Sequence, residues 1–353
     1  MSRISRITIL TLALVTLALL ASACVAPAPE TVVQTVEVEK EVIVTVEVEK
    51  EAEAPPEPVY DFDPSVTPNE PYKIALVLKN FTNPFWLTHQ KAAERAAEDF
   101  GVEVIVLAPS KPDNVEEQIR IVEDLIQKGV DGVAIAPANT QAIATAIQKL
   151  NEAGIPVVYD NTRGSGGDYV AYVGADNILV GQTMGKEMCK RLGGEGKVLV
   201  LEGMPGQQTA DDRRKGANQA LAECPDLEVA SQTAHWTRVE GMQVTENVLQ
   251  RFPDLDGIIG IGGEMSLGAL EALEDAGVAK DDVLVQAMDV YPDIAGSIKA
   301  GDLDYTISQA PGNQAYWSIA ALIKHLNGEE VPKEIRTPVV VVTADNVEEY
   351  AEE

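Results

Sequence analysis

The chain has 353 residues, 45% of them hydrophobic, which is enough for one large or two medium-sized domains with apolar cores. Its 56 acidic and 27 basic residues give a formal net charge of −29 at pH 7. Such a surface repels polyanions, so a nucleic-acid-binding role is not expected. The length also excludes a small scaffold that disulfides alone would hold together.

Residues 1–23 have the pattern of a secretory signal. Arg3 and Arg6 form a positive start, residues 7–20 are apolar but short for a transmembrane span, and small residues follow. The stretch LASAC at 20–24 resembles the bacterial lipobox, whose cysteine is lipidated and becomes the mature N-terminus, although Ala21 stands where Leu is most common. We therefore predict an exported protein that Cys24 anchors by lipid to the outer face of the cell membrane. The alternative is an ordinary cleaved signal with an incidental Cys24.

Residues 24–70 form an acidic and proline-rich segment ahead of the first predicted strand. The sequence TVEVEKE occurs twice, at 35–41 and 45–51, and five prolines follow. Charge repulsion and proline both favour extension, so we predict an extended, largely disordered tether. A short coiled coil is the weaker alternative, because β-branched residues are dense in the repeat.

From residue 72 onward, short apolar runs rich in β-branched residues alternate with helical patterns, which is typical of doubly wound α/β sheets with parallel strands. In a first series we predict strands at 72–79, 102–107, 132–136, 157–159 and 170–173, with helices at 84–100, 114–127 and 140–151. A second series has helices at 178–192, 212–222, 240–251, 265–276 and 294–300, with strands at 198–201, 227–233, 257–261 and 283–287. A last strand at 305–308, a helix at 313–327 and an apolar run at 338–342 are enough to cross back between two α/β units.

The residues that follow successive strands supply aromatic rings together with carboxylate and amide groups. Strand-to-helix loops of such units emerge on one edge, so these side chains should converge on a common cleft. Aromatic planes stack on the C–H faces of sugar rings, while polar planar groups exchange hydrogen bonds with hydroxyls. The alternative is structural: the aromatics pack in the core and each Asp caps a helix. We predict a neutral polyhydroxylated ligand, and the candidate contacts are Asn83, Phe85, Trp86, Asp160, Asn161, Asp211, Arg213, Trp236, Glu264, Asp289 and Gln309.

Several ordered motifs resemble the type I periplasmic sugar-binding proteins, and most of all their ribose-binding branch. NPFW at 83–86 resembles the family's Asn-Pro-Phe-aromatic segment, which sandwiches the sugar, and IPVV at 155–158 leads to Asp160 like the family strand that ends in a ligand aspartate. EMSLGA at 264–269 matches the start of a family helix. Trp236, Asp289 and Gln309 stand where the family has a stacking aromatic, a hydroxyl-binding aspartate and a hinge-side glutamine.

This resemblance implies two Rossmann-like lobes joined by a multi-strand hinge. Residues 72–174 and 310–338 would form the N-terminal lobe, and residues 175–309 and 339–353 the C-terminal lobe. It also implies a monomeric receptor that closes on a monosaccharide or polyol by hinge motion and delivers it to the permease of an ABC importer. A sensory or chemotaxis receptor would use the same closed surface and is the alternative.

Three positions depart from the family's ribose pocket. Asn161 stands where an arginine follows the ligand aspartate, and a second arginine aligns with Asp211, which leaves Arg213 as a substitute. Gly262 or Gly263 replaces an asparagine. We expect these changes to enlarge the site and make it more acidic, so that a hexose, a cyclic polyol or another larger neutral sugar fits better than ribose. The sequence also allows a cationic ligand.

The sequence gives little support to an enzyme on a Rossmann-like scaffold. Met265 occupies the position of the third glycine of a dinucleotide fingerprint, and GGEGK at 193–197 is followed by Val198 rather than by the Ser or Thr of a phosphate-binding loop. The three histidines His89, His235 and His325 lack metal-ligand spacing. We therefore expect no enzymatic activity, no cofactor and no metal.

Two cysteines besides Cys24 fall near the ends of consecutive predicted helices. In an exported chain Cys189 and Cys224 can oxidise to a disulfide, but spacing alone does not bring their Cα atoms within range. Two buried thiols that are not bonded to each other are the alternative, and the sequence favours neither arrangement.

Overall fold

The structure is a computed structural model that describes residues 57–351. The predicted signal, Cys24 and the tether up to residue 56 lie outside the described residues. Within residues 57–351, no helix is long and apolar enough to cross a membrane.

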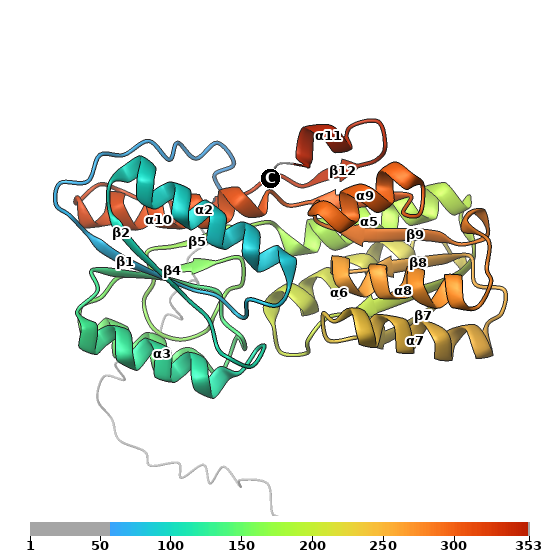
Figure 1. The fold of residues 1–353 in the computed structure, drawn as a ribbon, viewed down its shortest axis with the longest axis horizontal. Helices are drawn as coiled ribbons and strands as arrows, with labels where there is room; N and C mark the ends of the chain where they lie inside the picture. Colours follow the sequence, from blue (N-terminus) through green and yellow to red (C-terminus); the bar gives the residue numbers. More distant parts are fainter. Residues whose placement is uncertain (1–56, 352–353) are drawn as a thin grey trace, which may run out of the picture. The chain divides into compact units, whose positions relative to one another are not determined.

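Six parallel strands form the first sheet, in the order β11-β5-β4-β3-β1-β2 (Figure 1). The four inner strands, each four or five residues long, are almost completely buried, as expected for strands with helices on both faces of the sheet. The strands are β1 (Lys73–Val77), β2 (Glu103–Leu107), β3 (Gly132–Ile135), β4 (Val157–Asp160), β5 (Ala171–Gly174) and β11 (Glu334–Arg336).

Alternate residues of β1 point into two different apolar cores. Ile74 and Leu76 pack with α2 (Pro84–Phe100) and α10 (Pro311–Leu326), whereas Ala75 and Val77 pack with α3 (Val115–Lys128) and α4 (Ala144–Glu152). Figure 1 shows α2 and α10 on one face of the sheet and α3 on the other. We call this sheet with its four helices the N-terminal lobe.

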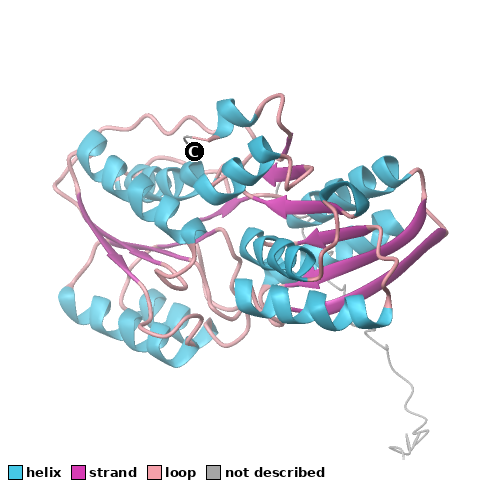
Figure 2. Ribbon diagram, turned by 45° about the vertical axis from the view of Figure 1, so that its right-hand side comes forward, coloured by secondary structure: helices cyan, strands magenta, loops and turns pink. Residues whose placement is uncertain are grey.

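The second sheet has the order β12-β10-β9-β8-β6-β7, and only β12 runs antiparallel to its neighbour. Its strands are β6 (Glu195–Glu202), β7 (Asp226–Thr233), β8 (Gly257–Gly260), β9 (Leu284–Met288), β10 (Tyr305–Ser308) and β12 (Val340–Val342). Helices flank it, as the cyan and magenta elements of Figure 2 show. They are α5 (Asn177–Leu192), α6 (Gln208–Leu221), α7 (Arg238–Arg251), α8 (Gly263–Asp275), η1 (Lys280–Asp282), α9 (Pro292–Ala300) and α11 (Val347–Tyr350). We call this unit the C-terminal lobe.

The predicted α/β class with two parallel-dominated sheets is confirmed, but some element boundaries differ. The predicted helix at 140–151 begins only at Ala144, because the Asn139 side-chain oxygen accepts the backbone N–H groups of Gln141 and Ala142 and holds a turn there. The predicted helix at 212–222 begins four residues early, at Gln208. Strand β11 was not predicted, since it is only three residues long and contains one apolar residue.

The last residues of the predicted tether are packed on the N-terminal lobe, which corrects the expectation of an extended spacer up to residue 70. Val59 pairs with Ile335 of β11: its N–H donates to the Glu334 carbonyl, and its own carbonyl accepts from Arg336, both at 2.8 Å. Phe62 is buried and meets Trp317 edge-to-face, with ring centroids 5.8 Å apart.

A disulfide joins Cys189, near the end of α5, to Cys224, which follows α6. The two Cα atoms are 6.3 Å apart. Helices α5 and α6 approach closely enough for this because Gly181 and Gly216 face the partner helix: a Cβ atom on Gly181 would lie 2.0 Å from the Arg213 carbonyl oxygen. Of the two alternatives left open by the sequence, the structure has the disulfide.

Candidate functional site

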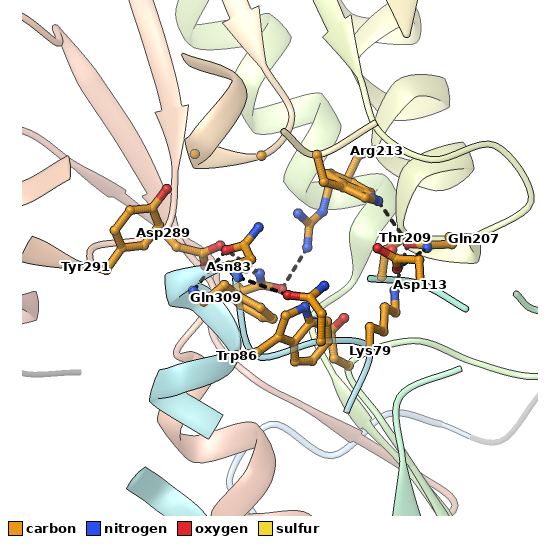
Figure 3. Close-up of a pocket in the computed structure, with 16 residues that line it drawn as sticks. Lys79, Asn83, Trp86, Asp113, Gln207, Thr209, Arg213, Asp289, Tyr291 and Gln309 are labelled. Atoms are coloured by element: carbon orange, nitrogen blue, oxygen red, sulfur yellow. Dashed lines mark hydrogen bonds between the residues drawn. The ribbon is translucent and has the colours of Figure 1, made fainter. Parts of the chain in front are cut away.

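A pocket lies between the two lobes, at the carboxyl ends of strands from both sheets (Figure 3). Its volume is about 50 Å³. A single bound water needs roughly 10–15 Å³, so the pocket has room for several waters or a small molecule. Its lining residues are Lys79, Asn80, Asn83, Phe85, Trp86, Asp113, Asn161, Gln207, Thr209, Arg213, Trp236, Gly262, Gly263, Asp289, Tyr291 and Gln309.

Three polar side chains form a hydrogen-bonded chain along one side of this pocket. Arg213 Nη2 donates to Gln309 Oε1 at 2.9 Å, and Gln309 Nε2 donates to Asp289 Oδ1 at 3.0 Å. Arg213 directs its other nitrogens to Asn177 and to the Ile261 carbonyl. None of the three chain members is more than 5% exposed. The chain therefore holds a carboxylate and an amide in fixed positions, where they can bind hydroxyl groups.

Four aromatic side chains also line the pocket, two from each lobe. Phe85 and Trp86 open helix α2 and stack edge-to-face with centroids 4.7 Å apart. Asn83 fixes this helix start, since its side-chain oxygen accepts the Phe85 N–H at 3.0 Å. Trp86 is also part of the N-terminal core, so it serves both as core and as pocket wall. Trp236 and Tyr291 come from the C-terminal lobe.

A buried polar cluster closes another side of the pocket. Lys79 and Asp113 of the N-terminal lobe meet Gln207 of the C-terminal lobe, with Lys79 Nζ 2.8 Å from Gln207 Oε1 (Figure 3). Burial lowers the pKa of the Lys79 ammonium to about 7, although the charge of Asp113 opposes this. Burial likewise raises the pKa of Asp113.

Left-handed backbone conformations of non-glycine residues are concentrated around the same pocket. Six non-glycine residues within 57–351 have left-handed backbone angles, and four of them line the pocket: Asp113, Asn161, Trp236 and Asp289. The other two, His235 and Ala310, are each adjacent in sequence to a lining residue. Such angles cost energy for residues other than glycine, and they cluster at functional sites. The backbone strain therefore singles out this pocket independently of its side chains.

The glycine pair 262–263 does not enlarge the site, contrary to the expectation from sequence. A Cβ atom on Gly262 would lie 2.7 Å from the Trp236 ring, and one on Gly263 would lie 2.5 Å from the Tyr291 hydroxyl. A Cβ atom on Gly203 would likewise meet the Trp236 ring, at 2.1 Å. The space that an asparagine would fill is thus taken by aromatic rings of this chain.

Three of the predicted contacts lie outside the pocket lining. Asp160 is completely buried behind it, with Oδ1 accepting the Ser318 hydroxyl at 3.1 Å. Asp211 has a half-exposed side chain that lies 3.9 Å from Arg214. Glu264 is paired with Arg238 Nε at 3.0 Å and accepts the Tyr291 hydroxyl at 2.8 Å; it positions a pocket residue rather than reaching the pocket itself.

The other predicted residues do line the pocket, and the structure adds six that sequence reasoning did not select. Two of the six, Gln207 and Thr209, lie in a polar stretch that follows a predicted strand, at residues 207–213. A third, Asp113, has a left-handed backbone conformation, which cannot be recognised from the sequence. The predicted residues in the lining are Asn83, Phe85, Trp86, Asn161, Arg213, Trp236, Asp289 and Gln309; the added ones are Lys79, Asn80, Asp113, Gln207, Thr209 and Tyr291. Within residues 57–351, no group of three or more His, Cys, Asp or Glu side chains is arranged to hold a metal ion.

The family model for the periplasmic binding protein domain matches residues 74–330. The chain belongs to the type I periplasmic sugar-binding proteins. As a member of this family it is a solute-binding component of sugar ABC transport rather than an enzyme, and its relatives work outside the cytoplasm.

Relatives and solved structures of this periplasmic sugar-binding family cover most of the chain. The ribose import binding protein of Salmonella typhimurium is 34% identical over 258 residues, which are 73% of this chain and 86% of the relative. A periplasmic solute-binding protein of Actinobacillus succinogenes with bound D-allose is 32% identical, with TM-score 0.75 over 79% of this chain and 100% of that one. A solute-binding protein of Bacillus halodurans with bound myo-inositol is 31% identical, with TM-score 0.74 over 80% of this chain and 98% of that one.

Proposed function

We propose that this protein captures one neutral monosaccharide or cyclic polyol between its lobes and delivers it to the permease of an ABC importer. Two lobes, 72–174 with 310–338 and 175–309 with 339–353, would close about the segments that connect β5 to α5, β10 to α10 and β11 to β12. The ligand would bind the closed form better than the open form and so shift the population toward closure.

The observation that carries this proposal is the pairing of aromatic faces with fixed hydrogen-bonding groups from both lobes in one small pocket. Phe85 and Trp86 would stack on one side of the ligand ring and Trp236 on the other. Asp289 and Gln309, which are already held by Arg213, would bind its hydroxyls. Contacts from both lobes are what a ligand needs in order to favour the closed state.

We propose a hexose or a cyclitol rather than ribose as the ligand. Asn161 is short where a ribose pocket has an arginine, and its amide nitrogen is engaged by Gln314 at 2.9 Å. The related proteins named above bind ribose, D-allose and myo-inositol, so the family accommodates ligands of more than one size. We infer that a six-carbon sugar or cyclitol is the ligand here.

Thermal unfolding of the purified protein with a panel of sugars tests this function. One or a few hexoses or cyclitols should raise the melting temperature, because a ligand that binds only the folded state stabilises it by mass action. The panel should include D-allose, myo-inositol and ribose, with amino acids and inorganic anions as comparisons. A shift with an amino acid or an anion and none with any carbohydrate would refute the proposal.

Trp86→Phe tests the aromatic contact at the site. The variant keeps an aromatic ring in the core but presents a smaller ring surface to the pocket. We expect affinity for the identified sugar to fall by roughly fivefold, which corresponds to the ~1 kcal/mol that an aromatic contact contributes. Leu87→Ala is the control, since that neighbouring side chain is exposed on α2. Equal affinities of the two variants would contradict the role of Trp86 as a stacking wall.

A further inference from the structure

One glutamine of the C-terminal lobe is inserted between segments of the N-terminal lobe. Gln207 lies in the loop between β6 and α6, and it is completely buried. It precedes helix α6 without making a side-chain capping bond, so its carboxamide is free to serve another purpose. That carboxamide reaches three separate N-terminal segments, which follow β1, precede α3 and follow β3.

All four hydrogen-bonding positions of this carboxamide are occupied. Oε1 accepts from Lys79 Nζ at 2.8 Å and from Trp236 Nε1 at 2.9 Å. Nε2 donates to Asp113 Oδ1 at 2.8 Å and to the Ala138 carbonyl at 3.1 Å. A flipped amide would turn its NH₂ group toward the indole N–H of Trp236 and its oxygen toward the Ala138 carbonyl, so only one orientation fits. Three of the four partners belong to the opposite lobe.

The residues on either side of Gln207 add further bonds across the cleft. The Gly206 carbonyl accepts the Thr140 N–H at 3.0 Å, and the Gln208 N–H donates to Thr140 Oγ1 at 2.9 Å. Gly206 has φ of +83°, and a Cβ atom there would lie 2.8 Å from Asn139 Nδ2. The loop 206–208 is thus shaped for close approach to the N-terminal lobe.

From this geometry we propose that Gln207 is a positioning residue that latches the two lobes together. None of its four bonds requires a ligand atom, so the latch favours the closed form by itself. It also fixes Lys79 and Trp236, two pocket-lining side chains, at the same time. The inference rests on the proposed hinge closure, but it adds that the protein populates the closed form before any sugar binds.

Opening the lobes would expose the carboxamide, Lys79 and the Ala138 carbonyl to water and would expose Asp113 further, and each bond would be replaced by a bond to water. Hydrogen bonds to charged groups keep more of their strength than neutral ones in this exchange. Two of the four bonds involve ionisable partners, Lys79 and Asp113, and that to Lys79 is charge-assisted when its amine is protonated. Loss of the latch should therefore lower the closed population by roughly tenfold to a hundredfold, and ligand affinity should fall by the same factor.

The test measures the distance between the lobes without ligand, using spectroscopic labels on exposed positions of α2 and α7. The wild-type protein should show a closed population, and Gln207→Ala should lose most of it. Gln219→Ala is the matched control: Gln219 pairs with Gln182 on the exposed surface of the C-terminal lobe. A wild-type protein without a closed population, or identical distance distributions for wild type and Gln207→Ala, would overturn the proposal.

Two substitutions that move a negative charge from position 113 to position 207 distinguish the loss of a latch from a general loss of folding. Gln207→Glu keeps both acceptor bonds but turns a carboxylate toward Asp113, so closure should be lost. Adding Asp113→Asn supplies a donor in place of that carboxylate, and Asn tolerates the left-handed backbone at 113. The double variant should regain part of the closed population, because the bond to the Ala138 carbonyl remains lost. Failure to regain any of it would count against the latch.

Titration with D-allose and myo-inositol keeps this inference distinct from the proposed function. If a sugar binds, Gln207→Ala should weaken it by the factor measured for closure and should raise its dissociation rate. If neither sugar binds while Gln207→Ala still opens the lobes, the latch stands and the choice of these ligands fails. If a sugar binds with unchanged affinity to Gln207→Ala, the latch fails and the sugar function stands.

Discussion

Beneath the aromatic wall of the pocket, His89 and Asp160 form a buried pair that must share a proton. His89 Nδ1 lies 3.3 Å from the Phe85 carbonyl oxygen, so this nitrogen carries a hydrogen, since a carbonyl only accepts. His89 Nε2 is then an acceptor in the neutral ring, and it faces Asp160 Oδ2 at 3.4 Å. Among the described residues, neither of these two atoms has another hydrogen-bond partner. A proton on Asp160 is the arrangement that satisfies both.

Burial sets the protonation of this pair. It raises the pKa of Asp160 to about 7 and lowers the pKa of His89 to about 3. Between about pH 4 and 6.5 the folded pair therefore carries one proton, on Asp160, and the unfolded chain also carries one, on His89. Because folded and unfolded states bind equal numbers of protons, the pair makes the free energy of unfolding neither rise nor fall with pH in this range.

Removing either partner should uncover the pH dependence of the other. In Asp160→Asn only His89 titrates, the unfolded chain binds more protons, and stability should rise from about pH 4 to 6.5 by up to ~1.4 kcal/mol per pH unit. In His89→Gln only Asp160 titrates, the folded chain binds more protons, and stability should fall from about pH 4 to 7. Urea unfolding without ligand at several pH values measures both, each relative to wild type. Parallel curves for the two variants would contradict a shared proton.

At the scale of elements, residues 57–71 act as a strap over the N-terminal lobe. Besides the pairing of Val59 with β11, Asn327 at the end of α10 donates to the Thr67 carbonyl at 3.0 Å and accepts the Asn69 N–H at 2.9 Å. Lys324 Nζ donates to the Ser65 carbonyl at 2.9 Å. The strap therefore covers the edge strand β11, which would otherwise present unpaired backbone groups.

Phe62→Ala should show how much the strap stabilises the lobe. Phe62 is 8% exposed and packs against Trp317, so truncation should lower the free energy of unfolding by about 3 kcal/mol, the lower end of the range for a buried Phe. Sugar affinity should stay within about twofold, because no strap residue lines the pocket. Tyr60→Ala is the control, since Tyr60 is half exposed. Denaturant unfolding and sugar titration measure the two effects, and equal stability of both variants would show that the strap is not anchored by Phe62.

The sequence predicted those parts of the fold that follow from local patterns. Parallel strands end at one edge, so residues directly after strands, such as Asp289 and Gln309, could be assigned to a cleft from their positions along the chain alone. Phe62 was missed because a single aromatic among prolines and acids has no periodicity. Lys79 was missed because a lysine at the end of a predicted strand is usually exposed to solvent. Gln207 was missed because nothing in the sequence distinguishes it from Gln208, and only the packing of the two lobes brings Gln207 into the pocket.

For the whole molecule, the strap bears on where an N-terminal attachment would join the folded part. The chain enters its folded part at Val59, beside β11, and β11 leads directly into the segment that crosses to β12. An attachment at the N-terminus would therefore be transmitted to the folded part beside β11, and no residue of the strap lines the pocket. Lipid on Cys24 is the attachment that we propose, since a lipid chain binds a membrane without a spanning helix.

Cys24→Ala should release the protein from membranes into the soluble extracytoplasmic fraction, because the thiol that would carry the lipid is gone. Sugar affinity should not change, since every residue that lines the pocket lies between positions 79 and 309. The control is the double variant Cys189→Ser with Cys224→Ser, which removes the other two cysteines and should stay in the membrane fraction. Fractionation followed by mass spectrometry of the N-terminus measures both location and lipid. Membrane retention of Cys24→Ala would show that an anchor other than this thiol holds the protein.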